Sequence, residues 1–151
     1  ETKPGQYEEY DAFMTVAEQE LTKMHNMINQ LHTVQENLKE MLKDVSNASV
    51  KKEGEKLLAD MKAWDEDMVQ RKSQAYDDVE NFPNKFSAEY IFMINQTSST
   101  IPRLNKASKD RKVELDAQWA GLKARGNQFI NTYIPAYNKV LWEAGIGALR
   151  L

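Results

Sequence analysis

The fold is decided by residues 10–45, YDAFMTVAEQELTKMHNMINQLHTVQENLKEMLKDV. Apolar side chains recur in this stretch with the heptad spacing that keeps one narrow stripe of a helix facing a partner. Because the stretch contains no proline or glycine, we predict one continuous amphipathic helix from about residue 7 to residue 46, roughly 60 Å long at 1.5 Å per residue. Ten of its eleven seam positions are apolar; the two rows are Tyr10, Ala17, Met24, Leu31, Leu38, Val45 and Met14, Leu21, Ile28, Gln35, Leu42.

Two further helices are predicted on either side of a proline. The polar turn at residues 46–49 precedes a second helix, for which Ser49 is the expected N-cap. Its apolar stripe continues to Val79, and Pro83 then separates it from a short third helix over about residues 85–96. The stripe of the second helix comprises Val50, Gly54, Leu57, Met61, Trp64, Met68, Ala75 and Val79, and the third carries Phe86, Tyr90 and Ile94 with a broad apolar cluster of Ile91, Phe92 and Met93.

A fourth helix is predicted to begin at Ile101 and Pro102, since proline is well tolerated in a first helical turn. We expect this helix to be kinked at Pro135 and to end near Ala144, where Gly145 is a stop signal. Its apolar positions are Leu104, Leu115, Trp119, Leu122, Phe129, Tyr133, Tyr137 and Val140.

The helix lengths favour one topology. The second and third helices together match the length of the first and of the fourth, and short connections favour antiparallel neighbours. We therefore predict an all-α fold, an elongated antiparallel three-armed helical bundle whose middle arm is broken near Phe82-Pro83, with Trp64 and Trp119 as the largest core anchors. A four-helix arrangement with a folded-back third helix is the alternative.

The composition is that of one helical domain over residues 1–151. The 151 residues include only 6 Gly and 4 Pro, too few turn formers for a sandwich, a barrel or a βαβ fold. No cysteine is present, so disulfides and thiolate metal sites are excluded. No apolar run is long enough for a transmembrane segment. Because the chain begins at Glu1 without a methionine, we expect it to be part of a larger protein.

Catalytic and metal-binding patterns are not found in the sequence. His25 and His32 lie seven residues apart beside the seam, and Glu36 is the one carboxylate in register with them, so we expect solvent-facing histidines rather than a metal site. The Glu-x-x-His motif of di-iron bundles does not occur, and neither does a phosphate-binding glycine motif. The acidic clusters at 65–67 and 77–80 are interpreted as solvated helix faces. We therefore expect no catalytic, cofactor-binding or metal-binding residue.

Charge is distributed unevenly along the chain. Residues 1–50 hold 4 basic and 9 acidic residues, whereas residues 101–125 hold 7 basic and 3 acidic ones. Such a basic segment could bind phosphate or anionic lipid, but in an antiparallel bundle it is better placed to complement the acidic first helix. Nucleic acid is not an expected partner at an overall charge of −3. The candidate basic face comprises Arg103, Lys106, Lys109, Arg111 and Lys112.

Three stretches carry a resemblance to a known family. They are residues 27–38, MINQLHTVQENL, residues 81–86, NFPNKF, and residues 133–138, YIPAYN, followed by Ala144-Gly145-Ile146. In these the chain resembles the C-terminal helical segment that follows the β-propeller in bacterial BNR-repeat, sortilin-like proteins, which often carry a glycosyl hydrolase label. The resemblance implies an exported accessory module, periplasmic, cell-surface or secreted, with any glycosidase chemistry in the propeller.

The expected function is therefore a non-catalytic helical docking or assembly module whose partner is the β-propeller of the parent chain or another protein. A candidate docking corner for the propeller is formed by Phe82, Pro83 and Phe86, although a purely structural corner is the commoner arrangement. Two alternatives stay open. The segment could contribute to a glycoside hydrolase site in the full-length parent, or it could be a free-standing dimeric coiled-coil adaptor, because a seam this regular can also pair between chains.

Overall fold

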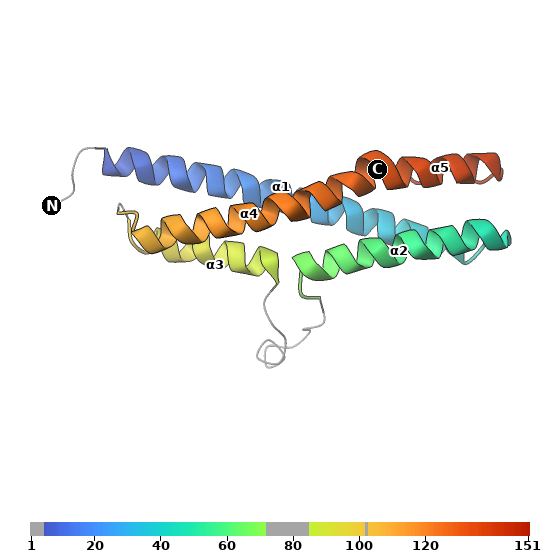
Figure 1. The fold of residues 1–151 in the computed structure, drawn as a ribbon, viewed down its shortest axis with the longest axis horizontal. Coiled ribbons are helices and arrows are strands. Elements are labelled where there is room, and N and C mark those ends of the chain that lie inside the picture. Colours follow the sequence, from blue (N-terminus) through green and yellow to red (C-terminus); the bar gives the residue numbers. More distant parts are fainter. Residues whose placement is uncertain (1–4, 72–84, 102) are drawn as a thin grey trace. The chain divides into compact units, whose positions relative to one another are not determined.

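The structure is a computed structural model that describes residues 5–71, 85–101 and 103–151 (Figure 1). Within these ranges the chain is all-α, as predicted, and contains no strand. The residues fall into two compact units, unit 1 from Glu1–Asn26 and Val69–Gly121 and unit 2 from Met27–Met68 and Leu122–Leu151. The three-armed arrangement stays a prediction. The helices are α1 (Gln6–Leu42), α2 (Ala48–Met68), α3 (Phe86–Ser98), α4 (Lys106–Gln128) and α5 (Ile134–Glu143), with a π-helical turn (Phe129–Tyr133) between the last two.

The heptad seam of α1 is buried in both units. The seam row that begins at Tyr10 is buried as far as Leu38, and the other row is buried from Ile28 to Leu42. The helix ends at Leu42, four residues before the predicted end, because the N–H groups of Lys43 and Asp44 donate to carbonyls only three residues back and close a tight turn. Val45 of the predicted seam therefore lies outside the helix.

The boundaries of α2 also differ from the prediction. The N-cap is Asn47 rather than Ser49, since the Asn47 Oδ1 accepts hydrogen bonds from the backbone N–H groups of Ser49 (3.1 Å) and Val50 (3.2 Å). The apolar stripe is buried as predicted from Val50 to Met68. The helix ends at Met68 instead of continuing toward Val79. The last turn holds three carboxylates at 65–67 beside the negative end of the helix dipole and carries no basic residue. Asp65 is 4% exposed, so the interpretation of this cluster as a solvated face was wrong for that residue. Ala75 and Val79 lie outside the described residues.

The third helix buries one face only. Phe86, Tyr90, Met93 and Ile94 are buried, whereas Ile91 is half-buried and Phe92 is 62% exposed, so the apolar cluster at 91–93 is not buried as a whole. The reason is the helical period, because position 92 projects away from the row that the buried residues share.

The fourth helix begins later than predicted. Ile101 precedes the helix and is 61% exposed, and α4 begins at Lys106, where the Asn105 Oδ1 accepts a hydrogen bond from the Ser108 N–H at 2.8 Å. The helix therefore begins at the asparagine N-cap and not at the proline that the sequence analysis took as its first turn. Figure 1 shows α3 alongside the first part of α4 in unit 1.

The predicted kink at Pro135 takes the form of a π-helical turn. The Ile134 N–H donates to the Phe129 carbonyl five residues back, and α-helical geometry resumes with Pro135 in the first turn of α5. Because proline has no N–H and its ring crowds the preceding turn, a wider turn ahead of it accommodates the ring.

The end of α5 follows the predicted stop signal. Gly145 adopts φ = 74°, the Ile146 N–H donates to the Leu141 carbonyl at 2.8 Å, and the Gly145 N–H donates to the Trp142 carbonyl at 3.0 Å, which together form a Schellman motif. The chain then returns along α5. The Asn138 side chain donates to the Leu149 carbonyl at 3.0 Å and accepts from the Leu149 N–H at 2.7 Å, so the last residues are held beside α5.

Candidate functional site

Trp119 anchors the interior of unit 1. Its side chain is buried, and its ring stacks on Phe86 of α3 with the centroids 6.3 Å apart. The indole Nε1 donates a hydrogen bond to the Glu20 Oε2 of α1 at 2.8 Å, which satisfies the polar atom of an otherwise apolar ring. One side chain of α4 thus contacts both other helices of this unit.

A second polar contact in unit 1 joins α3 to α4. The Tyr90 hydroxyl donates to the Asp116 Oδ1 at 2.9 Å, while the Lys112 ammonium donates to the other oxygen of the same carboxylate. Lys112 also lies 5.7 Å from the ring centroid of Phe13 on α1. Burial, followed by the hydrogen bond to Asp116, raises the pKa of Tyr90. The hydroxyl is therefore protonated at neutral pH, and the arrangement is that of a structural network rather than of an activated nucleophile.

The predicted basic face lies at and just before the start of α4. Lys109 pairs with Glu9 of α1, which is the predicted complementarity between this segment and the acidic first helix. Arg111 lies 3.6 Å from Glu89 of α3. The remaining cations behave differently: Lys106 pairs with Asp110 and Lys112 with Asp116 along α4, and Arg103 is exposed before the helix begins. Most of this positive charge is therefore matched by carboxylates of the chain itself.

The predicted docking corner is described only in part. Phe82 and Pro83 lie outside the described residues. Phe86 is 5% exposed and lies 6.0 Å from the Tyr90 ring in addition to its stacking on Trp119, so its side chain belongs to the interior of unit 1. The use of this corner in docking stays a prediction.

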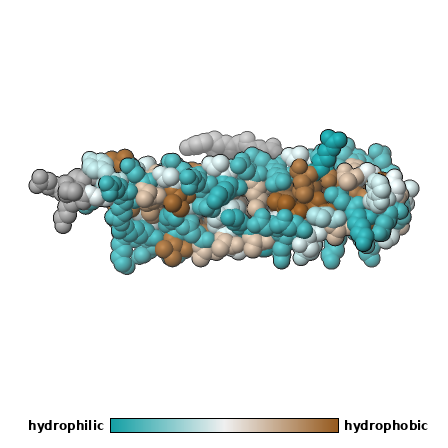
Figure 2. Space-filling model, turned by 90° about the horizontal axis from the view of Figure 1, so that it is seen from above, coloured by the Kyte–Doolittle hydropathy of each residue, from teal (hydrophilic) through white to brown (hydrophobic). Residues whose placement is uncertain are grey.

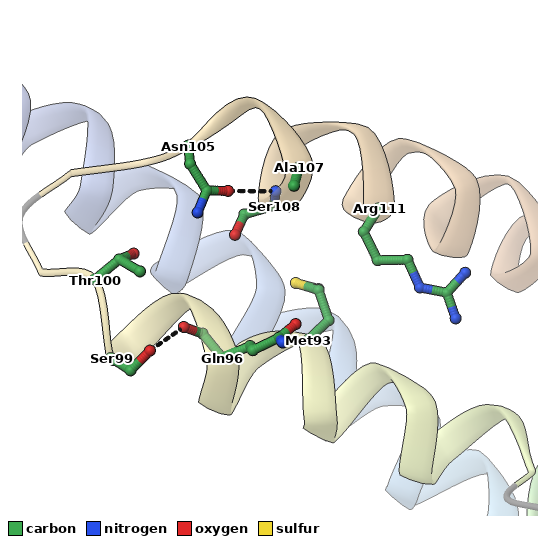
Figure 3. Close-up of a pocket in the computed structure, with 8 residues that line it drawn as sticks. All are labelled: Met93, Gln96, Ser99, Thr100, Asn105, Ala107, Ser108 and Arg111. Atoms are coloured by element: carbon green, nitrogen blue, oxygen red, sulfur yellow. Dashed lines mark hydrogen bonds between the residues drawn. The ribbon is translucent and has the colours of Figure 1, made fainter.

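A polar pocket lies where α3 turns into α4 (Figure 3). It encloses about 580 Å³, including space open to solvent. Its Arg111 is already paired with Glu89 and, at 3.1 Å, with Glu114, and its Ser99 hydroxyl donates to the Gln96 carbonyl at 2.6 Å. The pocket therefore shows no free charged group aimed at a ligand. It is lined by Met93 and Gln96 of α3, Ser99 and Thr100 of the turn, and Asn105, Ala107, Ser108 and Arg111 at the start of α4.

The interior of unit 2 depends on close helix approaches. Trp64 is fully buried, and its Nε1 donates to the Leu122 carbonyl at 2.8 Å. Gly126 leaves room for Trp64, because a Cβ at position 126 would lie 3.1 Å from the indole Cζ2. The Tyr137 hydroxyl donates to the Val50 carbonyl at 2.8 Å. Trp64 and Trp119 are thus core anchors, as the sequence predicted.

The two histidines and Gln35 lie on or beside the seam of α1. His25 is exposed as predicted. His32 is half-buried and its Nδ1 is buried without a hydrogen-bond partner, so the prediction of a solvent-facing side chain was wrong for His32, whose Nε2 lies 4.0 Å from the Glu36 Oε1. No cluster of three or more potential metal ligands occurs among the residues that the structure describes. Gln35, one turn from His32, is the polar position of the predicted seam. Its side chain is 6% exposed, and its amide Nε2 has no hydrogen-bond partner.

Several large hydrophobic side chains remain exposed. Figure 2 shows a face on which hydrophilic residues predominate and hydrophobic residues gather in separate patches. In unit 1, Val16 and Val113 are 47% and 71% exposed, and in unit 2 Trp142 is 81% exposed. The sequence analysis did not predict the exposure of any of the three. For Val16 and Val113, the spacing outside the apolar stripes of their helices could have indicated it. The others are Tyr7, Phe92, Ile101, Tyr133 and Leu151.

Comparisons with known proteins give no family for the chain. No protein-family model, no curated protein and no solved structure matches it significantly, so nothing links it to BNR-repeat or sortilin-like proteins. Among the helices of the described ranges, none is both long and apolar enough to cross a membrane.

Proposed function

We propose that the chain is a non-catalytic helical module that docks to another protein. The observation that carries the proposal is a pair of exposed apolar side chains on unit 1, Val16 of α1 and Val113 of α4. We call these two residues the valine strip.

The valine strip borders the contact between α1 and α4. Val16 lies on the same helical face as Phe13 and Glu20, which contact Lys112 and Trp119 of α4. Val113 follows Lys112 and lies one turn beyond Lys109, which pairs with Glu9. Two exposed apolar side chains therefore stand beside a row of charged groups. An apolar centre with a polar rim is the usual composition of a protein interface.

The partner that we propose is a β-propeller of the BNR-repeat class, and the proposed location is outside the cytoplasm. Both parts of the proposal come from the resemblance of residues 27–38, 81–86 and 133–138 to the helical segment of those proteins. The chain would then position the propeller and would leave any glycosidase chemistry to it.

Calorimetric titration of the purified chain with a BNR-repeat propeller from the same organism tests this function. Val113→Glu places a charge in the valine strip and should weaken binding by at least about tenfold, since desolvating an unpaired carboxylate costs more than 1.4 kcal/mol. Gln118→Glu adds the same charge elsewhere on α4 and should change the affinity less than about twofold. Equal affinities for the two variants, no binding by the unmodified chain, or turnover of a glycoside by the chain alone would each contradict the proposal.

A further inference from the structure

Unit 2 exposes a tryptophan that the proposed docking function does not use. Trp142 of α5 is 81% exposed, the largest exposed fraction among the large hydrophobic residues that the structure describes. Its ring therefore protrudes from the helix instead of lining a cavity. Burying an indole removes roughly 150 to 250 Å² from water, so such a side chain has much to gain from an apolar environment.

Basic residues flank this tryptophan. Lys139 lies one turn before Trp142 on the same face of α5. Arg150 follows Leu149, whose backbone is held by both polar atoms of the Asn138 amide, and Asn138 is itself one turn from Trp142. Lys139 thus shares a helical face with Trp142, and Arg150 follows a residue whose backbone is held one turn from Trp142. We call Lys139, Trp142 and Arg150 the α5 face.

The two basic residues of the α5 face form no ion pair within the described part of the chain, and Glu143 is the one carboxylate of α5 near them. Lys139 and Arg150 are exposed and make no ion pair with any residue that the structure describes, in contrast to the paired cations at the start of α4. Residues 122–151 contain four basic residues and one acidic residue, Glu143. Of these cations, Arg125 is paired, with Asp67 at 3.0 Å. The segment thus presents a net positive charge near an exposed indole.

We propose that the α5 face binds the surface of an anionic membrane. Tryptophan prefers the boundary between headgroups and acyl chains, and nearby lysine and arginine side chains are attracted to anionic headgroups. A protruding ring suits this partner, because a bilayer surface needs no shape complementarity, whereas a protein would have to supply a matching pocket. The contact would be peripheral and reversible, since one indole and two cations are a small anchor.

Co-sedimentation with vesicles tests the proposal on the intact chain. Vesicles of 30% phosphatidylglycerol in phosphatidylcholine should bind the chain, and vesicles of phosphatidylcholine alone should bind it much more weakly. Trp142→Ala should lower the partition coefficient by about tenfold or more, and Lys139→Gln with Arg150→Gln should lower it by roughly 30-fold. The matched control, Lys51→Gln with Lys56→Gln, removes the same charge from exposed positions of α2 and should have less effect than the α5 pair.

Tryptophan fluorescence gives an independent readout. Trp64 and Trp119 are buried, so a shift of the emission to shorter wavelength on adding anionic vesicles should come from Trp142 and vanish in Trp142→Phe. Equal binding to neutral and anionic vesicles, no binding, or binding unaffected by Trp142→Ala would overturn the proposal. A shift produced by a propeller but not by vesicles would also overturn it and would assign the α5 face to a protein. Trp142→Ala should leave the affinity for the propeller unchanged, which separates this proposal from the docking function.

Discussion

Replacing Gly54 by alanine tests how closely the helices of unit 2 approach. A Cβ at position 54 would collide with the Tyr137 hydroxyl, lie 2.6 Å from the Leu42 Cδ2, and lie 3.0 Å from the Tyr137 Cζ. The tyrosine cannot simply swing away, because its hydroxyl donates to the Val50 carbonyl at 2.8 Å. The substitution therefore forces neighbours of α1 and α5 to move.

The expected cost follows from three contributions. Overpacking a filled interior costs about 1 to 3 kcal/mol, and weakening the tyrosine hydrogen bond costs about 1 kcal/mol more. The higher helix propensity of alanine returns about 1 kcal/mol. Gly54→Ala should therefore lower the free energy of unfolding by about 1 to 3 kcal/mol.

Gly121→Ala is the matched control. Gly121 is also helical, but no atom lies within 4 Å of its Cβ position, so the propensity gain should stabilise the chain by about 0.5 to 1 kcal/mol. Urea denaturation followed by circular dichroism would measure both variants. Adding Tyr137→Phe to Gly54→Ala removes the closest atom, so the double variant should be more stable than the two single effects predict. A Gly54→Ala chain as stable as Gly121→Ala would refute the packing described for unit 2.

Three further perturbations test other parts of the structure. Trp119→Ala removes a buried ring that stacks on Phe86, so it should lower the free energy of unfolding in urea denaturation by about 3 to 5 kcal/mol. A loss below about 1 kcal/mol would place that ring on a surface. Gln35→Leu removes a buried amide nitrogen that has no hydrogen-bond partner, so it should raise the free energy of unfolding by about 1 to 3 kcal/mol. Thermal melts would measure the change, and a destabilised variant would show that the amide has a partner in solution. Burial and the hydrogen bond to Asp116 raise the pKa of Tyr90 from 10.0. Above pH 10 the folded chain therefore keeps a proton that the unfolded chain loses, so the free energy of unfolding should fall as the pH rises. The fall should be less steep in Tyr90→Phe. Equal slopes of the free energy of unfolding against pH for the two proteins would contradict the raised pKa of Tyr90.

The sequence predicted the buried faces better than the ends of the helices. The seam of α1 and the stripe of α2 are set by many apolar residues at a fixed period, so one exception such as Gln35 does not change which face is buried. The ends depend on single side chains that compete for the same backbone groups. Asn47 provides the cap that Ser49 was expected to provide, and Asn105 caps a helix that was expected to begin with Pro102 in its first turn. Proximity in sequence cannot decide between such neighbours.

The candidate surfaces were predicted only in part. The pairing of Lys109 with Glu9 follows from the charge asymmetry of the two helices, which the sequence displays. The spacing of Val113 outside the apolar stripe of its helix is compatible with its exposure, whereas the exposure of Trp142 depends on which row of α5 other segments cover, and the sequence does not fix that choice. Phe92 illustrates the same limit, because its neighbours in sequence are apolar and are half-buried (Ile91) or buried (Met93), whereas Phe92 itself is exposed.

The solution mass of the chain, measured by light scattering at micromolar to millimolar concentration and again with the propeller, tests the docking function most directly. We predict a monomer of 17.4 kDa that forms a one-to-one complex with the propeller. A dimer that ignores the propeller would contradict the docking module and favour the coiled-coil adaptor, in which the seam of α1 pairs with a second copy.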